Sequence, residues 1–106
     1  MKSNQILDKF VKVSSIFVVG RRWFEKTNGN TYHSAEIYVN GEFVHKIDFT
    51  YGYGDQYMYN AWTWLKKNGY INGKYSTDQS SPRIWCEHHG VKFAYTVADV
   101  KRKKDL

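Results

Sequence analysis

Several residue types are scarce in this chain of 106 residues, and each scarcity excludes a class of protein. Cys86 is the only cysteine, which rules out an internal disulfide framework and a cysteine-based zinc cluster and fits a reducing cytoplasm. The longest apolar run, Ile16 to Val19, is too short to cross a bilayer, and the polar start of the chain resembles no export signal. We therefore expect a cytoplasmic protein with no membrane partner.

Internal repeats and linker-like stretches are also absent, and the length suits one domain. Aromatic residues make up 18% of the chain, which argues against disorder. The net charge of +6 is uneven, because residues 101–106, KRKKDL, carry four positive side chains and one negative. We expect a single α+β domain over residues 1–100 and a basic C-terminal tail over residues 101–106. Such a tail either aids solubility or follows phosphates.

The first half of the chain shows a helical pattern followed by alternating patterns. Residues 4–12 place Ile6, Leu7, Phe10 and Val11 on one face, which predicts a short amphipathic helix. Residues 15–51 then alternate between apolar and polar positions, with TNGN and NG between the runs. Asn-Gly pairs between such runs are typical of hairpin turns. The pattern predicts a three-stranded antiparallel meander.

The second half predicts two helices and a strand. Asp55 can cap a helix that runs to Lys67 and ends before Gly69, and we expect this long central helix to pack against the sheet. Its apolar stripe consists of Tyr57, Met58, Ala61, Trp62, Trp64 and Leu65. Residues 70–80 read as a loop.

A Ser-Pro start and the stop at Gly90 favour a second helix containing RIWCEHH, with a strand over residues 83–88 as the alternative. Residues 91–100 predict a fourth strand. The expected order is α-β-β-β-α-α-β.

Two-residue turns at Asn28-Gly29 and Asn40-Gly41 would set the strand register. Residues that face one another across the three strands would then form rows, which include Arg21–Glu36–His45, Arg22–Ala35–Lys46 and Phe24–His33–Asp48. An arginine, a glutamate and a histidine in one row either form a cross-strand salt bridge or orient the histidine for acid-base chemistry. His33 opposite Asp48 leaves the same two interpretations open. A hydrolase ranks last, because no serine or cysteine nucleophile can be assigned beside either histidine. Neighbouring His88 and His89 diverge on a helix, so we expect no metal site.

The same register collects the segments RRWF, GNTYH and YGYGDQY at one edge of the sheet, beside the start of the helix at Asp55. Helix N-termini favour anions. The candidate ligand-binding residues are Arg21, Arg22 and Lys46 for charge, Trp23, Tyr32, Tyr51 and Tyr53 for stacking, the backbone of Gly52, Gly54 and Asp55 for a phosphate, and the adjacent His33. Arg22 is favoured over Arg21, because it has no predicted acidic cross-strand neighbour.

The segments RRWF, GNTYHS, VNGE and YGYGDQY resemble a small single-domain family of bacteriophages and prophages, over about residues 16–68. The resemblance implies a virus-encoded accessory protein in the host cytoplasm. Products of this size commonly bind nucleic acid, a host protein or a nucleotide signal used in host defence. The resemblance supplies no activity and no site residues.

These observations favour a non-enzymatic protein, without a cofactor, that binds nucleic acid or a nucleotide at the sheet edge. The alternative is a modulator of a host protein that acts through its aromatic surface in counter-defence or host takeover. Salt separates the two, because phosphate contacts weaken steeply as salt rises and an apolar interface responds little. The oligomeric state stays open.

Overall fold

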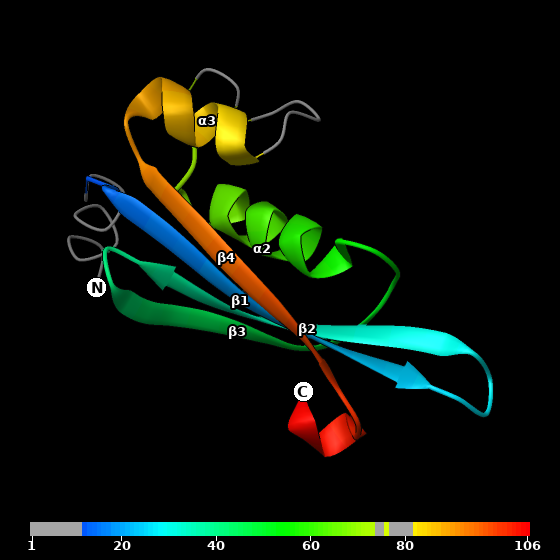
Figure 1. Ribbon diagram of the computed structural model, residues 1–106. Helices are drawn as coiled ribbons and strands as arrows, with labels where there is room; N and C mark the ends of the chain where they lie inside the picture. Colours follow the sequence, from blue (N-terminus) through cyan, green and yellow to red (C-terminus); the bar gives the residue numbers. More distant parts are fainter. Residues whose placement is uncertain (1–11, 74–75, 77–81) are drawn as a thin grey trace.

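The computed structural model describes residues 12–73, 76 and 82–106 of the chain and confirms an α+β fold with four strands. Helix α2 and helix α3 lie on one side of a twisted sheet (Figure 1). The elements are β1 (Ser15–Glu25), β2 (Asn30–Val39), β3 (Glu42–Tyr51), α2 (Gln56–Lys67), α3 (Pro82–His89), β4 (Lys92–Val100) and the 3₁₀ helix η1 (Lys103–Asp105). Residues 4–11 of the helix expected over residues 4–12, and Ser81 of the Ser-Pro start, fall outside the described residues, and Lys12 is not helical. The described order is β-β-β-α-α-β.

The strands are arranged in the order β3-β2-β1-β4. The meander β1-β2-β3 is antiparallel as predicted, whereas β4 runs parallel to β1 at one edge. The two sides of the sheet differ. We call the side under α2 and α3 the helix face; it carries Ile16, Val18 and Ile37. The other side, the open face, carries Phe17, Trp23 and Tyr32, and η1 lies against part of it (Figure 1).

Helix α2 begins and ends close to the predicted positions, but it is not long relative to the sheet. Its 12 residues span about 18 Å, whereas the 11 residues of β1 span about 36 Å. One end of the sheet therefore extends beyond α2 (Figure 1). Asp55 occupies the N-cap position, yet its side chain makes no capping hydrogen bond. Gly69 has a φ of 83° after the last turn, as a left-handed helix stop requires.

The helix interpretation of residues 82–89 is confirmed over the strand alternative. Trp85 and Cys86 are buried on α3, and the Trp85 ring lies edge-on to Trp62 of α2 at 6.0 Å between centroids. Burial raises the pKa of the Cys86 thiol to about 11. Gly90 has a φ of 69° where α3 ends.

The core lies between the helix face and the two helices. The strands contribute aliphatic side chains, and α2 contributes most of its predicted stripe, with Met58 and Trp64 partly buried. Gly20 of β1 lies directly under the Tyr57 ring, and a Cβ at residue 20 would collide with that ring. The buried members are Ile16, Val18, Ala35, Ile37, Val39, Tyr57, Ala61, Trp62, Leu65, Ile71, Trp85, Cys86 and Val91. Among residues 12–73 and 82–106, no helix is long and apolar enough to cross a membrane.

The turn at Asn40-Gly41 is confirmed, with φ angles of 54° and 83° and Val39 opposite Glu42. The turn predicted at Asn28-Gly29 is wrong, because the loop contains four residues, 26–29, between Glu25 and Asn30. The backbone N–H of Gly29 donates to the Glu25 carbonyl at 2.9 Å. The β1–β2 register is therefore displaced by two residues from the prediction, which keeps each side chain on its face but changes its partner.

Two register shifts between β2 and β3 change the predicted rows further. His45 pairs with Ile37 and stacks on Trp64 at 4.4 Å on the helix face, so it has left the row of Arg21 and Glu36. His33 lies opposite Thr50 and not Asp48. Each bulge adds a residue to one strand and turns the following side chains to the other face. Sequence alternation alone does not reveal them.

Candidate ligand-binding site

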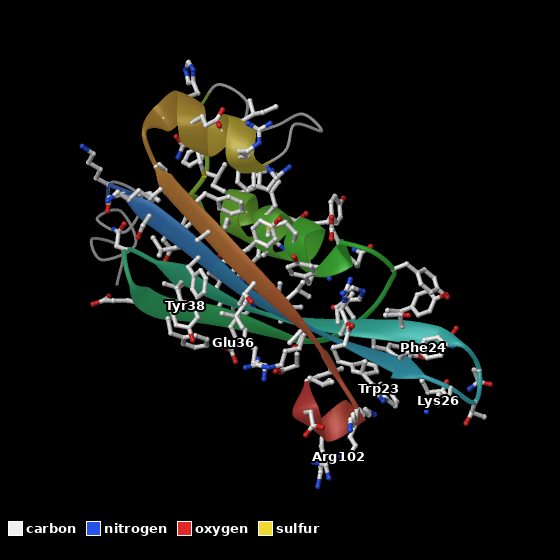
Figure 2. All side chains as sticks on the ribbon, in the orientation of Figure 1. Trp23, Phe24, Lys26, Glu36, Tyr38 and Arg102 are labelled. Atoms are coloured by element: carbon white, nitrogen blue, oxygen red, sulfur yellow. The ribbon has the colours of Figure 1, made fainter. Side chains whose placement is uncertain are left out.

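The three distinctive segments do meet at one end of the sheet. Trp23 pairs with Tyr32 on one side and with Val100 of β4 on the other, and Tyr32 pairs with Tyr51. This is the end that extends beyond α2, and Figure 2 shows Trp23, Phe24 and Lys26 along it. Because side chains alternate along a strand, Arg22 and Phe24 belong to the helix face, and Arg21 and Trp23 to the open face.

On the open face, the aromatic rings pack against one another. Trp23 stacks on Tyr32 at 5.6 Å, and Tyr32 stacks on Phe49 at 4.6 Å. The Lys103 ammonium of η1 lies 4.9 Å from the centre of the Phe49 ring. We call Trp23, Tyr32 and Phe49 the aromatic row. Each ring face in the middle of this row is covered by its neighbour, so the predicted stacking residue Tyr32 has no free face for a base.

Two predicted stacking residues remain exposed beside the row. Tyr51 is 53% exposed and Tyr53 is 56% exposed. Their hydroxyl oxygens are 2.8 Å apart, so one donates to the other, and the rings meet edge-to-face at 5.4 Å. This hydrogen bond, with smaller effects of burial and of the neighbouring phenol, raises the pKa of Tyr51. Both rings can therefore contact a partner outside the sheet.

Packing and backbone geometry explain both glycines of the YGYG stretch. Gly52 is buried, its N–H donates to the Thr31 carbonyl at 3.0 Å, and a Cβ there would collide with Gln56. Gly54 has a φ of 60° and has open space around its Cα. The N–H of Gly52 is thus engaged in the fold, which leaves it unable to receive the predicted phosphate.

His33 holds the YGYG loop in place through a hydrogen bond to Gly52. Its ring is fully buried and lies parallel to Tyr57 at 6.1 Å, and Nε2 is 2.9 Å from the Gly52 carbonyl oxygen. Because a carbonyl oxygen only accepts, Nε2–H donates this hydrogen bond; within the described residues Nδ1 has no hydrogen-bond partner. Burial lowers the pKa of His33, and the positive charge of Arg22 lowers it further, against opposing effects of the Gly52 hydrogen bond and Asp55. His33 is therefore a positioning residue held neutral.

A groove of about 690 Å³ opens beside this loop. It contains three basic side chains and one acidic side chain, together with the Phe24 ring, which is 54% exposed. We call it the basic groove. It is lined by Arg22, Phe24, Lys26, Thr31, Gly54, Asp99, Val100 and Lys101. The cations attract an anion and the ring offers a stacking surface, so the groove suits a ligand that has both a phosphate and a base.

Arg22 does have an acidic neighbour, contrary to the prediction. Its Nε lies 3.0 Å from Oδ1 of Asp99, whose side chain is 78% exposed. The prediction failed because the position of β4 beside β1 could not be read from the sequence. For the same reason, the sequence prediction missed Lys101 as a site residue. It missed Lys26 because the loop of residues 26–29 was predicted as a two-residue turn, and it also missed Phe24. Phe24 carried a usable signal, since it follows Arg22 by two positions and thus shares its face. An exposed pair of this kind contributes little stability, so Arg22 can exchange Asp99 for a phosphate.

Arg21 and Lys46 lie away from the basic groove, on the open face. Arg21 Nη1 is 3.0 Å from Glu36 Oε2, and the Lys46 ammonium donates to the Leu106 carbonyl at 2.9 Å. Partial burial alone would raise the pKa of Glu36, but the hydrogen bond and charge of Arg21, with help from Tyr38 and Lys46, hold it below the usual value. These cations serve contacts within the protein.

The predicted phosphate position at Gly52 to Asp55 retains one member in the groove, Gly54. Asp55 instead places an exposed carboxylate at the N-terminus of α2, where it competes with an anion for the positive end of the dipole. In the part of the chain that the structure describes, no three His, Cys, Asp or Glu side chains are grouped so as to hold a metal ion.

Comparison with known proteins found no family model, no curated protein and no solved structure that matches this chain. The geometry and charge of the basic groove are therefore the basis for a functional assignment.

Proposed function

We propose that the protein is a non-enzymatic binding protein for an anionic, base-containing ligand, either nucleic acid or a nucleotide, which it holds in the basic groove. One observation carries the proposal. The exposed Phe24 ring shares the groove with Arg22, Lys26 and Lys101, so one ligand can contact the ring with its base and the cations with its phosphate. Among the described residues, Phe24 contacts no other aromatic ring, and Lys26 and Lys101 form no ion pair.

The expected strength of these contacts supports ligand binding. Stacking of a base on an aromatic side chain contributes about 1–3 kcal/mol. Each phosphate contact releases counterions, so the basic side chains favour binding at low salt. The net charge of +6 also speeds the encounter with a polyanion. From the resemblance of its short motifs to phage proteins, we further propose that it is a virus-encoded accessory protein of the host cytoplasm.

The test is fluorescence anisotropy with a labelled single-stranded oligothymidylate of about ten nucleotides, within the site size of small single-strand binders, and with a labelled mononucleotide. For the oligonucleotide, we expect the logarithm of the binding constant to fall linearly as the logarithm of the salt concentration rises, with a slope of about −2. This slope corresponds to three phosphate contacts, each of which contributes about 0.7 in a single strand. Binding of the oligonucleotide alone identifies nucleic acid as the ligand, and equal binding of both identifies a nucleotide.

The matched variants are Phe24→Ala and Phe43→Ala. The two rings are similarly exposed, at 54% and 56%, but Phe43 lies at the opposite end of the sheet, beside Tyr38. We expect Phe24→Ala to weaken binding about tenfold, because it removes about 1.4 kcal/mol or more of stacking, and Phe43→Ala to leave it unchanged. Absence of binding for both probes at low salt, or equal affinity in the two variants, would disprove the proposal.

A second candidate function is modulation of a host protein, which the exposed Tyr51 and Tyr53 rings favour. Tyrosine is enriched at protein interfaces, because a rigid ring buries a large area while its hydroxyl can hydrogen-bond. For this function, partner capture from host lysate should persist at high salt and be lost in Tyr53→Ala but retained in Phe24→Ala. Capture that disappears with salt would remove this candidate.

A further inference from the structure

Strand β4 forms an outer edge of the sheet. It pairs with β1 over nine consecutive residue pairs, from Ser15↔Lys92 to Trp23↔Val100, without a register shift. No strand within the described residues pairs with its other side, and β4 lies along that side of the sheet in Figure 1. Such an edge presents a row of backbone N–H and C=O groups that can pair with another strand.

The direction of these backbone groups follows from one hydrogen bond. The N–H of Lys92 donates to the Ser14 carbonyl at 3.0 Å, so it points toward β1. Successive residues in a strand direct their backbone groups to opposite sides. Hence the outward groups of β4 belong to the odd-numbered residues, which are Phe93, Tyr95, Val97 and Asp99. These groups are spaced for pairing with another extended chain.

The two edges of the sheet differ in how they resist such pairing. The opposite edge, β3, has two register shifts against β2 and carries Glu42, Lys46 and Asp48. Bulges and charges are the usual means by which proteins block edge-to-edge association. In contrast, the middle of β4, residues 93–98, contains no charge, no proline and no glycine, and the charged residues Lys92 and Asp99 lie near its two ends. Of the two edge strands, β4 is therefore the one suited to pairing with another strand.

The side chains of β4 also fit a second copy of the same strand. Those on the open face are small and exposed, namely Ala94, Thr96 and Ala98, and Tyr95 on the helix face is 58% exposed. Antiparallel pairing centred on Thr96 aligns all nine residues of each strand, placing Thr96 opposite Thr96 and Tyr95 opposite Val97 of the second copy. Thr–Thr pairs and pairs of an aromatic with a β-branched side chain are favourable across strands.

We infer that two copies of this chain associate through β4 in antiparallel fashion, about a two-fold axis at Thr96, into a dimer with one continuous sheet. Two-fold pairing uses the same surface on both copies and closes on itself. The inference goes beyond ligand binding and does not rest on it, but the two surfaces adjoin, because Asp99 and Val100 of β4 also line the basic groove.

A disulfide at residue 96 tests the register directly. Thr96 directs its backbone toward β1, so the Thr96–Thr96 pair is a non-hydrogen-bonded pair, with about 4.5 Å between Cα atoms. That separation lies within the range a disulfide needs. We expect Thr96→Cys to form a covalent dimer under mild oxidation much faster than Thr63→Cys, whose cysteine would lie exposed on α2. Equal rates would overturn the inference.

Analytical ultracentrifugation of nucleic-acid-free protein supplies the second test. The unmodified chain should shift from 12.5 kDa to twice that mass as concentration rises into the high micromolar range. Thr96→Lys places two ammonium groups opposite each other and should weaken the dimer at least tenfold, while Thr63→Lys should not change it. Thermal unfolding of the monomer verifies that both variants fold. A chain that stays monomeric, or a dimer that survives Thr96→Lys, overturns the inference.

Discussion

At the end of the sheet that extends beyond α2, the open face and the helix face carry similar residues that make different contacts. Arg21 and Trp23 point to the open face, where Arg21 pairs with Glu36 and Trp23 stacks in the aromatic row. Arg22 and Phe24 point to the helix face, beyond the reach of α2, where they line the basic groove. In the segment RRWF, the fold therefore packs one ring, Trp23, and leaves the other, Phe24, exposed. Both arginines form an ion pair at 3.0 Å, but the carboxylate partner of Arg21 is partly buried, whereas that of Arg22 is exposed. The composition of a segment therefore does not identify a binding site. The candidate site is identified by the side chains that do not pack within the protein.

The largest expected effect concerns the packed part of the helix face. Replacing Gly20 with valine should lower the free energy of unfolding by about 3 kcal/mol, because the added side chain overlaps the Tyr57 ring and overpacks the core. Urea denaturation measures this change. The control is Gly29→Asn, where the φ of 71° tolerates asparagine and nothing lies within contact distance of the added Cβ. Equal stability of the two variants would contradict the close contact between β1 and α2.

A smaller effect distinguishes the aromatic row from the basic groove. Tyr32→Ala should cost about 2 kcal/mol of unfolding free energy, because Tyr32 has ring contacts with Trp23, Phe49 and Tyr51. Phe24→Ala should cost less than about 0.5 kcal/mol, as is usual for an exposed surface position. The comparison would fail if both changes destabilised the protein equally, since Phe24 would then serve packing and not a ligand.

The smallest expected effect is a pH dependence of the free energy of unfolding, caused by His33 on the helix face. The pKa of His33 is lower in the folded protein than in the unfolded chain. Between the two values the unfolded chain binds more protons, so stability should fall as the pH drops below about 6.5 toward the folded pKa. His33→Gln removes this titration and retains a donor for the Gly52 carbonyl. Denaturation at about pH 7.5 and about pH 5.5 should show the larger loss in the unmodified protein; equal losses would place the pH response elsewhere.

Local patterns predicted most of the elements. Alternation fixed the three strands of the meander and β4, and the stop residues Gly69 and Gly90 marked the ends of the two helices correctly. Short-range signals suffice here because hairpin turns and helix caps depend on adjacent residues. The convergence of the segments around Trp23, Tyr32 and Tyr51 also followed from hairpin geometry.

Contacts between distant segments could not be predicted in the same way. The four-residue loop after Glu25 and the two bulges displaced every predicted row, and the position of β4 depends on how α2 and α3 pack. As a result, Lys46 lies on the opposite face from Arg22, and Lys101 was not recognised as part of the groove. Register and strand order depend on tertiary packing, which no short motif encodes.

Because Cys86 is buried, the reaction of its thiol with an alkylating reagent can be used to follow the opening of the core. With a pKa of about 11, about one thiol in a thousand is ionised at pH 8, and only the thiolate reacts readily with alkylating reagents. Modification should therefore wait for α3 to separate from α2 and β4. The rate of alkylation then measures how often this part of the core opens, without the introduction of any label.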